Sequence, residues 1–189
     1  AEDGIRDVAV TGVQTCALPI SIEYATALGC TQLNCLAGIK PAYRDPLEAR
    51  ETFIKNLQYA APRLKAAGIK LLIEAINTRD MPGFFLNHSA QALDIIKAVG
   101  SDNLYFQYDI YHMQIMEGDL APTIEKNLAL IPHMQLADTP GRHEPGSGEI
   151  NYDFLLPFLD RIGYNGWIGC EYKPATTTEA GLGWTKPYL

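Results

Sequence analysis

The chain alternates amphipathic stretches with short apolar runs from Ser21 onward, and a glycine often separates the two. The runs at residues 69–77 and 104–110 are nearly continuous in apolar residues, which is typical of strands buried on both faces of a parallel sheet. The amphipathic stretches between them indicate helices. The pattern therefore predicts parallel strands joined by right-handed helical crossovers, with five strands at residues 31–37, 69–77, 104–110, 131–136 and 166–172.

Two helices are predicted before the second strand. Residues 21–28 form the first, which Gly29 ends. Asp45 followed by Pro46 is typical of an N-cap and a first helical residue, so the second helix is expected to run from there to Gly68. Its inward-facing residues are expected to be Leu47, Phe53, Ile54 and Leu57.

Later helices carry similar start and stop signals. Ser89 is expected to cap a helix that Gly100 ends in the left-handed conformation. Pro122 is expected to begin the next helix, and Asn151 to cap a further one that Gly163 ends. The apolar stripe of that last helix is predicted to comprise Phe154, Leu155, Phe158, Leu159 and Ile162.

Repeated β/α units favour an α/β fold of the (β/α)8 barrel type, with strands 4–8 of the eight and their helices present here. The alternative is a doubly wound open sheet, which usually binds its ligand at a Gly-rich first turn, but no G-x-G-x-x-G follows any predicted strand. A complete barrel needs roughly 200 residues or more. The first and last strands would therefore lack partners, and we expect the isolated chain to aggregate and to be inactive.

Residues 1–20 differ from the rest because they show no amphipathic period. The stretch VTGVQTCALPI, from Val10 to Ile20, resembles a translated sequencing-adapter oligonucleotide. Residues 1–20 are therefore predicted to be a non-native segment, and residues 21–189 the C-terminal portion of the barrel domain. The alternative is a genuine edge strand around Val8 to Val13.

Charge and composition point to a small-molecule partner. The net charge is -7, the pI is near 5.0, and the 15 lysines and arginines form no run that could follow a nucleic-acid backbone. The four cysteines have no zinc-ligand spacing, so a reduced, cytoplasmic compartment is expected. No apolar stretch reaches the roughly 18 residues of a membrane span, and the acidic start lacks the basic region of a secretory signal.

Four apolar runs end in polar residues that are able to bind a metal ion: Glu74, Asp109, Gln135 and Glu171. Burying a carboxylate is unfavourable unless it is paired, hydrogen-bonded or bound to a cation. Equivalent ends of parallel strands meet at one end of a barrel, so we expect these four residues to converge. Their oxygens suit Mg²⁺ or Mn²⁺. The alternative is that each acid pairs with a lysine or arginine of a neighbouring strand.

Four longer motifs make the chain recognisable: IEAINTRDMPGFFLN from Ile73, NLYFQYDIYHMQIMEGDL from Asn103, QLADTPGRHEPGSGEINY from Gln135 and GYNGWIGCEYKP from Gly163. Through them, essentially all of residues 21–189 resembles the hydroxypyruvate isomerases of the xylose isomerase-like TIM-barrel superfamily. The resemblance implies a metal-assisted interconversion of hydroxypyruvate and tartronate semialdehyde, and it leaves a homo-oligomer open for the full-length protein.

The resemblance also implies roles for individual residues. Glu74 and Glu171 would act as acid and base, while Asp109 and Gln135 would complete the shell of a divalent metal. A related sugar-epimerase branch has histidine at the Gln135 position, which favours the hydroxypyruvate branch here. A 3-epimerase or an inosose dehydratase of the same superfamily, and an inactive fragment, are the alternatives. Ala75 replaces a proline that is frequent in the family.

Three further residues are candidates for substrate binding. His112, three residues beyond Asp109, could donate to a substrate oxygen, or it is a structural hydrogen-bonding residue. Arg142 lies in the loop after the fourth visible strand, and its planar guanidinium suits a carboxylate. It is alternatively a solvated residue that pairs with Glu144. Lys173 is a second candidate for the substrate carboxylate.

Overall fold

A computed structural model describes residues 17–188 of the chain. The chain divides into two compact units, Ala1–Gln107 and Tyr108–Leu189. In both, parallel strands follow one another in chain order with helices between them. This is the β/α arrangement of part of a TIM barrel, so the predicted fold class is confirmed.

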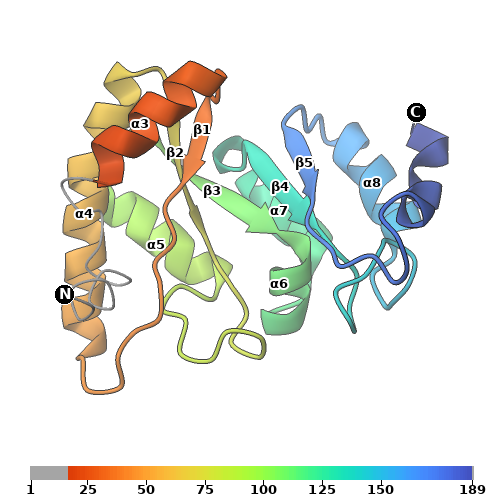
Figure 1. Cartoon of the computed structure of the whole chain (residues 1–189). Coiled ribbons are helices and arrows are strands. Elements are labelled where there is room, and N and C mark those ends of the chain that lie inside the picture. The colour runs from red at the N-terminus through yellow and green to blue at the C-terminus, as the bar shows by residue number, and fades with distance from the viewer. Residues whose placement is uncertain (1–16, 189) are drawn as a thin grey trace. The chain divides into compact units, whose positions relative to one another are not determined.

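In its described part, residues 17–107, the first unit contains three helices, two complete strands and the start of a third strand (Figure 1). Strand β1 pairs in parallel with β2, and β2 pairs in parallel with β3. The elements are α3 (Ala17–Leu28), β1 (Gln32–Asn34), α4 (Pro46–Ala66), β2 (Lys70–Glu74), α5 (Ser89–Val99) and β3 (Leu104–Asp109), the last of which ends in the second unit. Both β1 and β2 are shorter than predicted, and β2 ends at Glu74 itself.

Helix α4 begins as its sequence predicts, because the Asp45 side chain accepts a hydrogen bond of 2.7 Å from the Leu47 amide. Its buried face is a series at helical spacing: Ala49, Phe53, Leu57, Ala60 and Leu64. Leu47 lies outside this series and is 71% exposed, so its predicted inward position is wrong. The helix packs against β2 and α5.

Helix α5 confirms one predicted end and corrects the other. Gly100 has φ 69° and its amide donates to Ile96, which is the predicted left-handed stop. Ser89 is the first helical residue, whereas His88 occupies the N-cap position and makes no side-chain cap. The prediction of Ser89 as the cap is therefore wrong by one position.

The second unit contains the parallel pair β4 and β5 with helices around it (Figure 1). Its elements are α6 (Ile110–Met116), α7 (Leu120–Asn127), η1 (Leu128–Leu130), β4 (His133–Leu136), α8 (Tyr152–Arg161), β5 (Trp167–Cys170) and η2 (Ala180–Tyr188). Helix α6 was not predicted. It follows Asp109 directly, because the Asp109 side chain caps it by accepting from the His112 amide at 3.1 Å. Helix α7 begins two residues before Pro122.

Helix α8 covers one face of β4 and β5. The Asn151 side chain caps it as predicted, accepting from Phe154 at 3.1 Å, and Gly163 follows its end with φ 79°. Leu155 and Leu159 are buried, whereas Phe154 is 49% exposed. The apolar stripe is therefore narrower than predicted, and Phe154 instead stacks on Phe158 at the helix surface.

A close backbone approach precedes β5. A Cβ added at Gly166 would lie 2.4 Å from the Pro132 carbonyl oxygen and 2.5 Å from the Tyr164 hydroxyl. The Tyr164 hydroxyl donates to the Trp167 carbonyl at 2.8 Å. Only glycine fits at this position, and its fit helps to fix the pairing of His133 with Trp167 and the register that follows.

The predicted boundary at residue 20 falls within α3, because this helix already begins at Ala17. The alternative edge strand around Val8 to Val13 lies outside the described residues. Whether residues 1–20 are native stays a prediction. Among residues 17–188, no helix is long and apolar enough to cross a membrane.

Candidate active site

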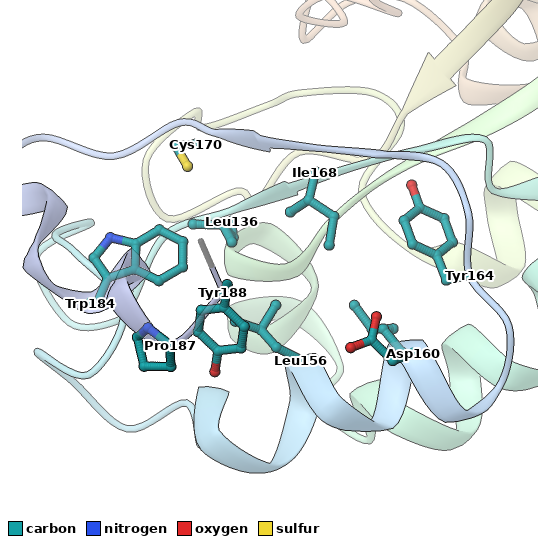
Figure 2. A pocket seen from close by; sticks show the side chains of 10 residues that line it. Leu136, Leu156, Asp160, Tyr164, Ile168, Cys170, Trp184, Pro187 and Tyr188 are labelled. Atoms are coloured by element: carbon teal, nitrogen blue, oxygen red, sulfur yellow. The ribbon is translucent and has the colours of Figure 1, made fainter.

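The two faces of the β4–β5 pair differ in chemistry. Leu136, Ile168 and Cys170 line a partly open pocket on the side of α8 (Figure 2). Successive strand residues point to opposite faces, so Gln135 and Gly169, which pair in the register, belong to the other face. A Cβ at Gly169 would indeed lie 3.6 Å from the Gln135 side chain. By the same alternation, Glu171 follows β5 on the Gln135 side.

The space beside α8 is a cavity of about 590 Å³. Apolar and aromatic residues dominate its lining, and none of the predicted site residues belongs to it. Its lining residues are Leu136, Leu156, Leu159, Asp160, Tyr164, Ile168, Cys170, Trp184, Pro187 and Tyr188. The candidate chemistry of this unit therefore belongs to the opposite face of the strands.

Asp109 and His112 lie together at the start of α6. Both side chains are buried, and the His112 Nε2 atom is 3.6 Å from Asp109 Oδ2. That separation exceeds a normal hydrogen bond, but it allows an ionic attraction when the imidazole is protonated. The His112 ring also meets the Tyr111 ring edge to face at 5.3 Å. The cap of α6 therefore orients a carboxylate and an imidazole toward one another.

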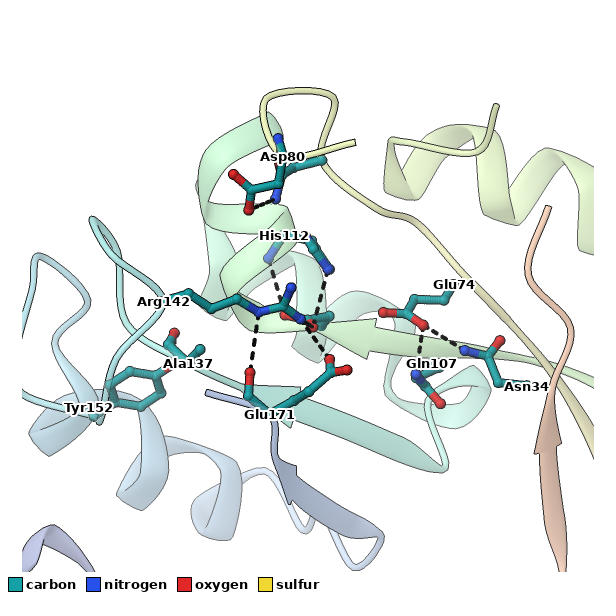
Figure 3. A network of polar contacts seen from close by, with 11 residues as sticks. Asn34, Glu74, Asp80, Gln107, His112, Ala137, Arg142, Tyr152 and Glu171 are labelled. Carbon is teal, nitrogen blue, oxygen red and sulfur yellow. Dashed lines mark hydrogen bonds and ion pairs between the residues drawn. The ribbon is translucent and has the colours of Figure 1, made fainter. Parts of the chain in front are cut away.

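Arg142 joins two of the predicted carboxylates (Figure 3). Its Nη2 atom lies 2.8 Å from Glu171 Oε2 and 3.9 Å from Asp109 Oδ2. Its Nε atom also donates to the Glu171 carbonyl at 3.3 Å, and its guanidinium lies 5.1 Å from the centre of the Tyr111 ring. Arg142 therefore does not take the alternative partner Glu144. The pairing of an acid with an arginine, which was the alternative to a metal site, is observed at Glu171.

The environment of Asp109 favours a proton or a cation. The pKa of the Asp109 carboxyl is raised to about 7, mainly by burial, and the charge of Glu171 acts in the same direction. The His112 amide and the Arg142 charge oppose this shift. Asp109 is thus poised between its neutral and charged forms near neutral pH, as is common for groups at functional sites.

Backbone contacts join the loop of Arg142 to the segment after β5. The Lys173 amide donates to the Arg142 carbonyl at 2.7 Å, and the Lys173 carbonyl lies 2.7 Å from Nδ1 of His143. Lys173 itself is exposed. These contacts fix the backbone of Lys173, while the role of its side chain in substrate binding stays a prediction.

Glu74 ends β2 in the first unit and is only 4% exposed. Its Oε2 atom accepts from Asn34 Nδ2 at 2.5 Å and from Gln107 Nε2 at 2.8 Å, as Figure 3 shows. Asn34 pairs with Leu72, two residues before Glu74, and Glu74 pairs with Gln107. The parallel register therefore places all three polar side chains on one face of β1, β2 and β3.

The predicted site residues thus fall into two groups. Asp109, His112, Arg142 and Glu171 come together in the second unit, where Gln135 shares the strand face of Glu171. Glu74 belongs to the first unit, and the convergence of all four predicted metal ligands stays a prediction. Oxygen atoms of Asp109 and Glu171 already approach one positively charged nitrogen, so this donor set suits a cation.

Sequence reasoning missed the residues that hold the site residues in place. Asn34 and Gln107 support Glu74, and Asp138 supports the loop of Arg142. Gln107 could have been suspected from its polar character within an apolar run. Asp138 could have been suspected because it lies two residues beyond the fourth strand, at the start of a loop rich in glycine and proline.

The chain resembles several known proteins over most of its described length. It is 53% identical over 168 residues to the hydroxypyruvate isomerase of Escherichia coli, covering 89% of this chain and 65% of that protein. It is 49% identical over 169 residues to the 2-oxo-tetronate isomerase of Cupriavidus necator, again with 89% and 65% covered. The chain therefore spans 65% of the length of these two relatives.

A solved structure is also similar to this chain. A crystal structure described as an AP endonuclease of family 2 from Brucella melitensis superposes with a TM-score of 0.88 at 45% identity. The superposition covers 91% of this chain and 66% of that one. In addition, residues 20–188 match the sequence profile named xylose isomerase-like TIM barrel. With that match over most of its length, the chain belongs to the xylose isomerase-like TIM barrel family.

Proposed function

We propose that the protein containing this chain is an isomerase that moves a carbonyl group between adjacent carbons of a small hydroxy-oxo acid. The specific reaction proposed is the interconversion of hydroxypyruvate and tartronate semialdehyde. The observation that carries the proposal is the position of Arg142, whose guanidinium approaches both Asp109 and Glu171. A planar cation beside a proton-accepting carboxylate suits a substrate that carries its own carboxylate.

In the proposed reaction, a carboxylate removes a proton from the carbon beside the carbonyl, and a proton returns to the neighbouring carbon. Glu171, which is about half exposed, can accept a proton, and Glu74 is proposed as the second acid-base group. His112 is proposed to donate to a substrate oxygen, and Arg142 or Lys173 to hold the substrate carboxylate.

We further propose Mg²⁺ or Mn²⁺ as the cofactor, held by Glu74, Asp109, Gln135 and Glu171. When bound, such an ion would act as a Lewis acid and stabilise the negative charge that develops on the substrate. Two observations support this choice. Asp109 and Glu171 offer hard oxygen donors, and both already approach the positive charge of Arg142. The raised pKa of Asp109 means that protons compete with a cation for this carboxylate below about pH 7.

Three substrate classes can be compared in one set of assays: short hydroxy-oxo acids, neutral ketoses and DNA with an abasic site. Hydroxypyruvate and 2-oxo-tetronate are both short acids, so Arg142 would serve either. A neutral ketose tests the epimerase alternative, and an abasic-site DNA duplex tests the activity suggested by the Brucella melitensis description. The net charge of -7 favours a small acid over DNA. The cytoplasmic location expected from the cysteines belongs to this proposal as well.

The decisive experiment uses the full-length protein that contains this chain, and it measures product formation and solvent deuterium incorporation with each substrate, with and without Mn²⁺. We expect turnover of a short hydroxy-oxo acid and none of the ketose or the DNA. Faster turnover of the ketose than of both acids would refute the proposal. Thermal stabilisation by Mn²⁺ that persists in Asp109→Asn and Glu171→Gln would refute the proposed metal ligands.

A further inference from the structure

One buried carboxylate organises the loop that follows β4. Asp138 is fully buried, and its two oxygens accept four backbone hydrogen bonds. Oδ1 accepts from Thr139 at 2.9 Å and from Ile150 at 3.0 Å, while Oδ2 accepts from Gly146 and Gly148, each at 2.9 Å. One side chain therefore ties the beginning of the loop to its end.

The close fit of the loop depends on a glycine. A Cβ added at Gly148 would lie 2.2 Å from the Thr139 carbonyl oxygen and 2.7 Å from Asp138 Oδ1. No side chain fits there without displacing backbone. The loop therefore packs closely around the Asp138 carboxylate. A substitution at Gly148 disturbs the packing, and a substitution at Asp138 disturbs the hydrogen bonds.

Arg142 lies midway along this loop in an uncommon conformation. Its φ is 57°, which is unfavourable for a residue with a long side chain, so surrounding contacts must hold it. The Asp138 amide donates to the His143 carbonyl at 2.9 Å, and the Lys173 amide donates to the Arg142 carbonyl at 2.7 Å. The backbone of Asp138 thus adjoins Arg142, and its side chain fixes the segments on both sides.

We propose that Asp138 is a positioning residue that holds the Arg142 guanidinium against Glu171 and Asp109. This role of Asp138 rests on the proposed function in one respect, namely that Arg142 binds a substrate carboxylate. Asp138 does not itself touch the substrate in this proposal. It acts by keeping the loop backbone, and with it the left-handed Arg142, in the one arrangement from which Nη2 reaches both carboxylates.

Asp138→Asn is the most selective substitution. The amide keeps the shape of the carboxylate, and its oxygen can still accept from Thr139 and Ile150. Its NH₂ group would face the amides of Gly146 and Gly148, which then lose their acceptor. The variant therefore releases the far part of the loop while the beginning of the loop stays bonded.

The first measurement is the solvent-exchange rate of the Arg142 Nε–H proton by NMR in the full-length protein that contains this chain. This proton is directed at the Glu171 carbonyl, and Arg142→Lys identifies its signal by removing it. We expect exchange to become about tenfold faster in Asp138→Asn, because losing a buried charge-assisted hydrogen bond shifts an equilibrium by at least that factor. Gly148→Ala, which pushes the loop away without changing the charge, should have the same effect.

The second measurement is hydroxypyruvate affinity across a double-mutant cycle of Asp138→Asn and Arg142→Met. If Asp138 acts through Arg142, each single variant should weaken binding about tenfold, and the double variant should be no weaker than Arg142→Met alone. A general loss of stability would instead add to the effect of Arg142→Met. Failure of the wild type to bind hydroxypyruvate would reject the proposed function, while the exchange rate would still decide the role of Asp138.

Asn151→Ala is the matched control. It removes the cap of α8 one residue beyond the loop, so it should lower stability by a similar amount without releasing Arg142. Faster Nε–H exchange in Asp138→Asn and Gly148→Ala, with a wild-type rate in Asn151→Ala, supports the proposal. Wild-type exchange in both loop variants, or additive losses of affinity in the cycle, overturns it.

Discussion

The carboxylates of the two units are stabilised by different chemistry. In the first unit, Glu74 accepts hydrogen bonds from two neutral amides, Asn34 and Gln107. In the second unit, Asp109 and Glu171 face the positive charge of Arg142. Amides orient a carboxylate but leave its charge in place, whereas a guanidinium largely neutralises the charge of its partners.

This difference suggests different duties within the proposed site. A carboxylate that neutral donors hold in a fixed orientation suits proton transfer or ligation of a metal ion. Two carboxylates that share one arginine lose part of their ion pairing when another anion binds nearby. A substrate carboxylate would be such an anion, because it attracts the same guanidinium. Glu74 should therefore tolerate changes in salt, while the Arg142 cluster should respond to ligands and pH.

The largest expected effect comes from removing a proton acceptor in either unit. In the full-length protein, Glu171→Gln and Glu74→Gln should each slow solvent deuterium incorporation into hydroxypyruvate by about 10²–10⁴-fold, because an amide cannot accept the proton. Glu149→Gln changes an exposed carboxylate that accepts a hydrogen bond from Gln114, and it should keep the wild-type rate. Incorporation at the wild-type rate in either test variant would refute the two-carboxylate mechanism.

A large pH-dependent effect is expected at Asp109, whose folded pKa of about 7 lies above the usual value near 3.8. Below about pH 4 the group is protonated in both states, and it destabilises the fold increasingly as the pH rises to 7. Asp109→Asn keeps the cap of α6 without the charge. It should therefore increase the free energy of unfolding by up to about 4 kcal/mol at pH 8, and by almost nothing at pH 4.

Urea unfolding at pH 4, 6 and 8 measures this difference. Asp94→Asn, which removes an exposed partner of Arg50, should show no comparable rise with pH. An Asp109→Asn variant that is less stable than the wild type at pH 8 would contradict the assigned direction of the pKa shift.

A smaller effect is expected when the charge of Arg142 is kept but its shape is lost. Arg142→Lys should raise the KM for hydroxypyruvate by about tenfold, with a smaller fall in kcat, because lysine cannot offer a planar pair of donors. Arg161→Lys, at the end of α8, serves as the control. An unchanged KM would move recognition of the substrate carboxylate to Lys173 or His112.

The smallest effect should come from the neutral donors of the first unit. Asn34→Ala removes one of the two amides from Glu74 and should lower the free energy of unfolding by about 1 kcal/mol. Because the donor is uncharged, the loss should be the same at low and high salt, in contrast to that of Arg142→Met. If the loss of stability in Asn34→Ala disappeared in 1 M salt, the distinction between neutral partners in the first unit and a charged partner in the second would be refuted.

Local signals in the sequence predicted the elements of the fold well. Asp45, Asn151, Gly100 and Gly163 mark helix ends because caps and left-handed stops depend on neighbouring residues alone. The exposure of Leu47 was missed, since burial at a helix start depends on which elements pack there.

The individual site residues were predictable, but their partners were not. An acid that ends an apolar run is visible in the sequence, as Glu74 and Asp109 show. Helix α6 was missed because the same Asp109 both ends a strand and caps a helix. Arg142 and Glu171 are 29 residues apart, and no local pattern encodes a contact over that distance.

The glycine fit before β5 limits how this region can vary in length during evolution. Gly166 and Tyr164 hold the turn against Pro132, and the alternation of side chains begins from that point. Inserting one residue between the turn and β5 would bring Cys170 to the face of Gln135 and send Glu171 toward α8. Inserting two would restore the faces but shift Glu171 along the strand by about 6.6 Å. Length variation should therefore accumulate before this turn or beyond Lys173, and not between them.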